Sequence, residues 1–156
     1  MKLLQDYMKK CIKDSKKNNM SLHVIGDISK FSDELQSVIK EAEEVTSVND
    51  GISFQIALNY GARDEITNAT KKILASGLKA EDVTPEVISK YLYTADVPDP
   101  DILIRTGGEQ RISNYLLWQI AYSEIIIKNE HWPEFGKNLL AESIQEFGKR
   151  QRRYGK

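Results

Sequence analysis

The chain has 156 residues, of which 40% are hydrophobic and 29% are charged, and its formal net charge is −1. This composition is typical of one ordinary globular domain, and it excludes disordered, collagen-like and membrane-spanning chains. The single cysteine, Cys11, excludes an internal disulfide and favours a reducing cytoplasm. The first residues include Asp6 and no continuous apolar run, so they do not predict a secretory signal.

The charge is unevenly distributed along the chain. Residues 149–156 contain five basic side chains and no acidic one, whereas the rest of the chain carries 17 basic and 23 acidic side chains. A basic tail on an acidic body either binds a polyanion or is a solvated helix end favoured by the helix dipole, and both interpretations stay open. Nucleic acid is not expected as a partner, because aromatic and basic residues are not interleaved.

Helices and short apolar strands alternate in the first half of the chain. Apolar residues recur at helical spacing near the start, and Ser32 caps a later helix that has two acidic residues in its first turn. The predicted elements are a helix over 2–17, a strand over 22–25, a helix after Ser32, a strand over 52–58 and a helix over 62–75.

The second half continues this alternation. Thr84 caps a helix that begins with Pro85, and Pro98 and Pro100 mark an extended connector. The further predicted elements are a strand over 101–105, a helix over 113–122, a strand over 124–128 and a closing helix over 134–150. The order of elements predicts an α/β fold in which helices flank a parallel sheet. Ligands of such sheets bind beyond the carboxyl ends of the strands.

The segment 101–124, DILIRTGGEQRISNYLLWQIAYSE, carries the clearest functional pattern. Its strand ends at Arg105, turns through two glycines, reaches Arg111 and Ser113, and closes on Glu124. Two guanidiniums can each make forked hydrogen bonds to phosphate, and glycines let the backbone approach a ligand. The N-terminus of the predicted helix over 113–122 would add partial positive charge. The pattern predicts a diphosphate site; the alternative is a solvated loop with surface ion pairs.

The same segment closely resembles a signature of the cis-prenyltransferases, the undecaprenyl diphosphate synthase family. Residues 57–66, ALNYGARDEI, resemble that family's Asn-Tyr-Gly-Gly-Arg motif, with Ala62 in place of the second glycine. Trp132-Pro133-x-Phe135 is a third similarity, and the terminal RRYGK resembles the family's Arg-x-Gly end. The resemblance covers essentially the whole chain and implies an undecaprenyl diphosphate synthase-like fold.

The resemblance implies cis-prenyl chain elongation, in which isopentenyl diphosphate condenses with an allylic diphosphate to make polyprenyl (undecaprenyl) diphosphate. It assigns substrate binding to Arg105, Glu109, Arg111 and Ser113. Glu124 matches a carboxylate that binds Mg²⁺, the implied cofactor, together with an aspartate that has no counterpart here. Gln110 stands where some members have a histidine that helps to hold the metal, and it is a weaker ligand.

Family members begin with a strand and a loop that carries Asp-Gly-Asn-Gly-Arg, and this sequence is absent here. We therefore expect residues 1–156 to be a single domain, the C-terminal part of a cis-prenyltransferase domain, N-terminally incomplete. Its catalytic aspartate would lie in the missing segment, so the chain alone would be weakly active or inactive. The resemblance also implies a cytoplasmic homodimer with a peripheral membrane contact through its lipid product.

An alternative function is a non-catalytic accessory subunit, or a truncated remnant, that binds a homologous partner. Such a subunit would use Arg153, Tyr154 and Gly155 to complete the partner's active site. The turn and helix start at 59–65 are predicted to be structural, and His23 and His131 do not have the spacing of metal ligands.

Overall fold

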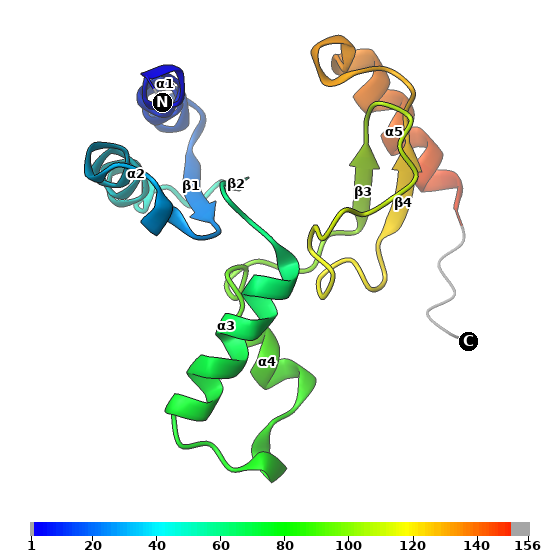
Figure 1. Cartoon of the computed structure of the whole chain (residues 1–156). Coiled ribbons are helices and arrows are strands. Elements are labelled where there is room, and N and C mark those ends of the chain that lie inside the picture. Colours follow the sequence, from blue (N-terminus) through cyan, green and yellow to red (C-terminus); the bar gives the residue numbers. More distant parts are fainter. Residues whose placement is uncertain (1, 151–156) are drawn as a thin grey trace. The chain divides into compact units, whose positions relative to one another are not determined.

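The computed structural model describes residues 2–150, and these form two compact units that divide between Val97 and Pro98. The single-domain prediction stays a prediction. Figure 1 shows that each unit contains strands and helices. The elements of the first unit are α1 (Lys2–Asn18), β1 (Met20–Ile25), α2 (Asp33–Thr46), β2 (Ile52–Ala57), α3 (Ala62–Ala75) and α4 (Pro85–Tyr91), with short 3₁₀ turns at Ile28–Lys30 and Ala80–Asp82.

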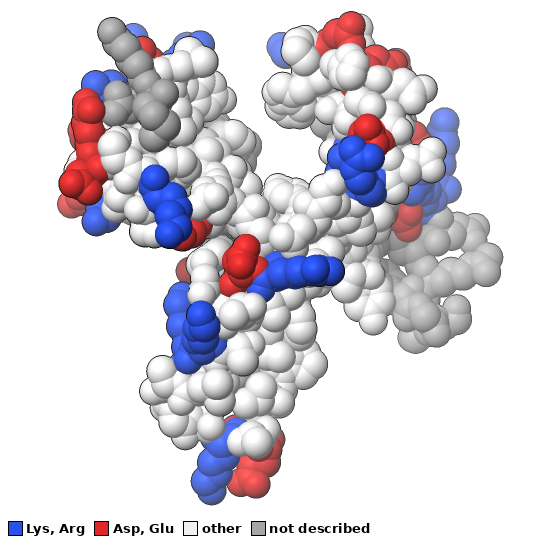
Figure 2. Space-filling model, in the orientation of Figure 1, with Lys and Arg blue, Asp and Glu red and all other residues white. Residues whose placement is uncertain are grey.

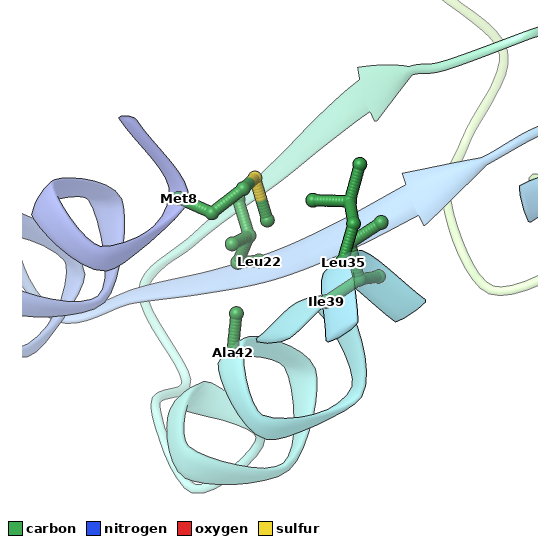
Figure 3. Close-up of a cluster of buried hydrophobic side chains, with 5 residues drawn as sticks. All are labelled: Met8, Leu22, Leu35, Ile39 and Ala42. Atoms are coloured by element: carbon green, nitrogen blue, oxygen red, sulfur yellow. The ribbon is translucent and has the colours of Figure 1, made fainter. Parts of the chain in front are cut away.

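In the first unit, β1 and β2 pair in parallel, with Met20 opposite Ile52 and Ile25 opposite Ala57. Helices α1 and α2 pack on β1 and on each other. Figure 3 shows the apolar side chains that these three elements bring together. The fully buried members of this core are Met8, Leu22, Leu35, Ile39 and Ala42. The predicted helix after Ser32 is confirmed, and the Ser32 hydroxyl accepts a hydrogen bond from the Leu35 amide.

The outer edge of β1 is closed by side chains of α2. The Leu22 amide donates to Thr46 Oγ1 at 2.9 Å, and the Val24 amide donates to Glu43 Oε1 at 2.8 Å. Thr46 Oγ1 in turn donates to the carbonyl oxygen of Ala42 at 2.8 Å. Amides on a strand edge would otherwise be unpaired inside the protein, so α2 supplies hydrogen bonds to this edge as well as apolar packing.

The turns after the strands of the first unit lie close together. Gly26 has φ +121°, and a Cβ there would lie 2.1 Å from the carbonyl oxygen of Leu58, so glycine is required. Further along the chain, the carboxylate of Glu65 is buried. It accepts hydrogen bonds from the Tyr60 hydroxyl at 2.5 Å and from the Tyr93 amide at 2.8 Å. These contacts support the structural interpretation of the turn and helix start at 59–65.

The second unit contains β3 (Ile102–Arg105), β4 (Glu124–Ile127), a 3₁₀ turn at Trp132–Glu134 and α5 (Lys137–Lys149). Strands β3 and β4 pair in parallel, with Ile102 opposite Glu124 and Arg105 opposite Ile127. Helix α5 packs on β4, and Figure 1 shows the two side by side. Both units therefore confirm the predicted α/β fold with parallel strands and flanking helices.

The helix predicted over 113–122 is wrong. These residues form a series of turns, and Ser113, Asn114 and Leu116 have positive φ values of 55°, 61° and 47°. Three left-handed residues within four positions are incompatible with a right-handed helix. The turns instead bury the side chains of Gln119 and Ile120. No helix N-terminus therefore lies at Ser113.

The closing helix begins three residues later than predicted, because the backbone at Gly136 is extended (φ −100°, ψ −171°). Trp132 and Phe135 stack before it, with ring centroids 5.9 Å apart.

Within residues 2–150, each helix is too short or too polar to cross a lipid bilayer. On the face shown in Figure 2, basic and acidic side chains are interspersed between wide uncharged areas.

Candidate functional site

The candidate site lies on the loop that follows β3, at the carboxyl end of the strand. Gly107 and Gly108 have φ values of +85° and +71°, which favour glycine. Their amides donate to the carbonyl oxygens of Glu130 and Lys128 at 2.8 and 2.9 Å. The loop after β4 thus holds the glycine turn in place. These two hydrogen bonds join the loop that follows β3 to the loop that follows β4.

Arg105 organises this loop from the end of β3. Its Nη1 donates to the carbonyl oxygen of Arg111 and to Ser113 Oγ, the latter at 3.3 Å. Its Nε is buried and has no hydrogen-bond partner among residues 2–150. A buried guanidinium N–H without a partner is uncommon in proteins. Arg105 therefore keeps one donor available for an acceptor from outside this part of the chain.

Arg111 forms an ion pair with Glu109, and both side chains are substantially exposed. Such a pair contributes little to stability, since solvent screens it. It does place the Arg111 guanidinium beside the loop, and Arg111 lines the same pocket as Arg105. The structure therefore brings together the four residues predicted to bind substrate, Arg105, Glu109, Arg111 and Ser113.

The pocket has a volume of about 230 Å³, and apolar side chains form part of its wall. The parallel register explains their position. Leu103 and Arg105 alternate with Ile102 and Ile104 on β3, and they lie beside Ile125 and Ile127 of β4 on one face of the sheet. The lining residues are Leu103, Arg105, Glu109, Gln110, Arg111, Ile112, Ile125 and Ile127. The site thus combines two guanidiniums with an apolar floor.

Glu124 lies on the other face of the same sheet. It begins β4 and alternates with Ile125, so its side chain points toward α5 together with that of Ile126. Arg150, which follows α5, donates from Nη1 to Glu124 Oε2 at 2.9 Å and to the carbonyl oxygen of Ile125 at 3.0 Å. The irregular segment before β4 does not bring Glu124 to the loop that carries Arg105.

The described residues do not fit a Mg²⁺ site at Glu124. Magnesium prefers carboxylates, phosphates and waters in octahedral geometry, whereas one Glu124 oxygen already faces a guanidinium. Between residues 2 and 150, no group of three or more His, Cys, Asp and Glu side chains is arranged to hold a metal ion. The role of Glu124 as a Mg²⁺ ligand stays a prediction.

Two further residues of the second unit, Arg150 and His131, were not assigned to a site by the sequence. Arg150 was grouped only with the basic tail, because nothing in the local pattern identifies Glu124 as its partner. His131 lies beside the glycine turn, with its Nδ1 3.5 Å from where a Cβ of residue 107 would be. The sequence predicted that His131, next to Trp132, is a packing or surface residue. In the structure His131 is exposed, which agrees with a surface position.

Both units are parallel α/β layers, and the loop after β3 carries the paired guanidiniums. Residues 1–155 match the family described as "Putative undecaprenyl diphosphate synthase", and the chain belongs to this family.

Among curated relatives, the chain is 42% identical to an isoprenyl transferase of Agrobacterium fabrum, with 99% of this chain and 64% of that protein covered. It is 47% identical to a ditrans,polycis-undecaprenyl-diphosphate synthase ((2E,6E)-farnesyl-diphosphate specific) of Vibrio vulnificus, with 92% of this chain and 59% of that protein covered. The chain thus spans about three fifths of the length of such relatives.

Solved structures agree with the sequence relatives. Lavandulyl diphosphate synthase from Lavandula x intermedia, in complex with dimethylallyl diphosphate, is similar with a TM-score of 0.95 and 31% identity, covering 100% of this chain and 70% of that chain. A probable undecaprenyl diphosphate synthase from Campylobacter jejuni is similar with a TM-score of 0.88 and 34% identity, covering 99% and 72%.

Proposed function

We propose that this chain supplies the isopentenyl diphosphate half of a cis-prenyltransferase, which elongates an allylic diphosphate to polyprenyl (undecaprenyl) diphosphate. The observation that carries the proposal is one pocket that has Arg105 and Arg111 beside apolar side chains. A guanidinium offers a planar pair of donors that matches phosphate oxygens. Relatives named as undecaprenyl diphosphate synthases support the reaction class.

In this proposal each residue has a defined task. The unpartnered Nε of Arg105 donates to a diphosphate oxygen, while its Nη1 keeps the loop folded through Arg111 and Ser113. Arg111 contributes the second guanidinium, and Glu109 orients it. The Ser113 hydroxyl, already within reach of Arg105, donates to the same head group. These contacts hold the building block so that its carbon end is presented in a fixed orientation.

The apolar floor suits the five-carbon end of isopentenyl diphosphate. Leu103, Ile125 and Ile127 lie on the Arg105 face of the sheet and lose contact with water when an apolar group covers them. An inorganic diphosphate would make the charged contacts alone. The pocket is therefore proposed to prefer a diphosphate that carries a short hydrocarbon group.

The test is calorimetric titration of the 156-residue chain with isopentenyl diphosphate. We expect Arg105→Gln and Arg111→Gln each to weaken binding at least tenfold, since each removes a charge-assisted contact of about 1.5–3 kcal/mol. Arg63→Gln, which removes one positive charge from the first unit, is the control and should change the affinity less than twofold. Equal loss in all three variants would contradict a local site.

Turnover requires more than this pocket. The family resemblance places the allylic diphosphate on a loop with Asp-Gly-Asn-Gly-Arg, which does not occur in residues 1–156. We infer that the 156-residue chain incorporates radiolabelled isopentenyl diphosphate into farnesyl diphosphate weakly or not at all, even with Mg²⁺. Incorporation near the rate of a full-length relative would refute this inference.

The remaining features of the proposal come from the resemblance. They are Mg²⁺ as the cofactor that would stabilise charge on the leaving diphosphate, homodimerisation, a role in cell-wall lipid supply and a cytoplasmic location with peripheral membrane contact. The accessory-subunit alternative depends on Arg153, Tyr154 and Gly155, which lie outside the described residues. Co-purification with a full-length homologue would favour that alternative.

A further inference from the structure

A polar cleft lies at the carboxyl end of the β1–β2 sheet in the first unit. Its volume is about 400 Å³, compared with about 230 Å³ for the pocket beside Arg105. The loops after β1 and β2, one face of α3 and Tyr93 form its wall. Ligands of parallel α/β sheets bind beyond the carboxyl ends of the strands, so the cleft lies where a ligand is expected. The residues predicted to bind substrate belong to the second unit.

The two loops at the rim of the cleft are joined to each other. The Asp27 amide donates to the Asn59 carbonyl oxygen at 3.2 Å, and Asn59 Nδ2 donates to the Asp27 carbonyl oxygen at 2.9 Å. Asp27 Oδ1 accepts hydrogen bonds from the amide and the hydroxyl of Ser29 at 3.0 and 2.5 Å. The rim is therefore preorganised, and this carboxylate is engaged within its own turn.

The α3 face of the cleft carries a row of polar side chains. Asp64, Asn68 and Lys71 follow each other at spacings of four and three residues, so they share one face of the helix. Asp64 and Lys71 are about 10 Å apart along the helix axis, which is too far for an ion pair. Asn68 Nδ2 donates to the Tyr93 hydroxyl at 2.8 Å. That hydroxyl can still donate its own proton, and Asn68 keeps its carbonyl oxygen as an acceptor.

The cleft has a second cation in Lys30, which ends the 3₁₀ turn after β1. Among the described residues, Lys30, Asp64 and Lys71 form no ion pair. Unpaired lysines alone would be an ordinary solvated surface. Here two of them share one cleft with a carboxylate, an amide and a phenol. Ammonium groups bind phosphate, whereas carboxylates and amide oxygens accept hydrogen bonds from hydroxyl groups.

We propose that this cleft binds a small polyhydroxylated compound that carries a phosphate group, the chemistry of a phosphorylated sugar. Lys30 and Lys71 contact the phosphate, and Asp64, Asn68 and Tyr93 bind the hydroxyl groups. A sugar without phosphate leaves the two ammonium groups without a partner, and inorganic phosphate leaves the carboxylate without a donor. The proposal does not depend on the proposed function, because the site lies in the first unit and its readouts need neither isopentenyl diphosphate nor turnover.

The first test is titration of the 156-residue chain with glucose 1-phosphate and glucose 6-phosphate, followed by the NMR shifts of the amides of residues 64–71. We expect at least one of these to bind about tenfold more tightly than glucose or inorganic phosphate, since only a phosphorylated sugar makes both sets of contacts. Lys30→Gln and Lys71→Gln should each weaken this binding about fivefold through loss of a charge-assisted hydrogen bond. Lys40→Gln, which removes the same charge from an exposed position of α2, is the control.

The second test separates the hydroxyl contacts from the phosphate contacts. Asp64→Asn should weaken binding of the sugar phosphate about fivefold while leaving binding of inorganic phosphate unchanged or tighter, because it removes a negative charge that accepts from hydroxyl groups. Asp33→Asn is the matched control, since Asp33 occupies the first turn of α2 as Asp64 occupies the first turn of α3. Circular dichroism checks that each variant is folded.

The proposal is overturned if neither sugar phosphate binds more tightly than inorganic phosphate, because the cleft would then attract charge alone. It is also overturned if Lys40→Gln loses as much affinity as Lys30→Gln and Lys71→Gln, or if Asp64→Asn behaves like Asp33→Asn. A failure of isopentenyl diphosphate binding would contradict the proposed function and leave these readouts unaffected.

Discussion

Arg105 and Glu124 lie on opposite faces and at opposite ends of the β3–β4 sheet. Arg105 ends β3 beside Ile127, whereas Glu124 begins β4 beside Ile102 and pairs with Arg150. Successive side chains of a strand point to opposite faces, so this separation follows from the register. The diphosphate pocket and the Glu124 carboxylate are therefore two distinct places in the second unit, and each can be tested alone.

The apolar floor should determine selectivity between diphosphates. Ile127→Ala removes apolar surface beside Arg105 without changing charge. We expect the affinity for isopentenyl diphosphate to fall by about three- to tenfold, on the scale of about 0.8 kcal/mol per buried methylene, with little change for inorganic pyrophosphate. Parallel calorimetric titrations measure both. Ile144→Ala, an exposed isoleucine of α5, is the control, and equal losses for the two ligands would contradict the prediction.

The Thr46 hydroxyl should stabilise the first unit through the edge of β1. Thr46→Val keeps the shape but leaves the buried Leu22 amide without its acceptor. An unsatisfied buried donor costs about 1–3 kcal/mol, so we expect a loss of that size in the free energy of unfolding. Urea denaturation followed by circular dichroism measures it. Thr70→Val removes a similar hydroxyl-to-carbonyl bond from an exposed helix position and should change stability by less than about 0.5 kcal/mol.

Two glycines should respond to alanine in opposite directions. Gly26→Ala places a Cβ against the Leu58 carbonyl oxygen at a positive φ, and we expect a loss of about 3 kcal/mol in the free energy of unfolding. Gly148 lies within α5, and a Cβ added there would meet no atom outside the helix backbone within 4 Å, so Gly148→Ala should stabilise the chain by about 0.5–1 kcal/mol. Thermal unfolding distinguishes the two, and a stable Gly26→Ala variant would show that the turn can rearrange.

The Ser29 hydroxyl should control the titration of Asp27. A hydrogen bond from this hydroxyl, followed by one from the Ser29 amide, holds the pKa of Asp27 below its ordinary value of 3.8. A lowered carboxyl pKa stabilises the fold above the ordinary value, and this contribution is lost as the pH falls through the lowered one.

We therefore expect Ser29→Ala to raise the pKa of Asp27 toward its ordinary value, as followed by the NMR shift of the carboxyl carbon. Ser37→Ala, whose hydroxyl bonds to the Asp33 carbonyl oxygen, is the control and should leave the Asp27 titration unchanged. An unaltered pKa in Ser29→Ala would contradict the assigned cause.

Elements with strong local signals were predicted correctly. The Ser32 and Thr84 hydroxyls cap α2 and α4 because a side-chain acceptor within three residues satisfies an unpaired amide of the first turn. The segment 113–122 was mispredicted because apolar periodicity does not reveal left-handed backbone. There the chain must return from the end of β3 to the start of β4, and turns at Ser113, Asn114 and Leu116 accomplish this.

By itself the sequence determined the residue types of the loop after β3, its resemblance to the cis-prenyltransferases and the alternation of strands with helices in the first unit. These follow from residue types and short spacings. Only the tertiary structure decided which faces the side chains occupy: Arg105 beside the apolar floor, and Glu124 against Arg150, 26 residues away along the chain. The face that a side chain occupies depends on strand register and on where α5 packs. Both are set by contacts between residues that are distant in sequence.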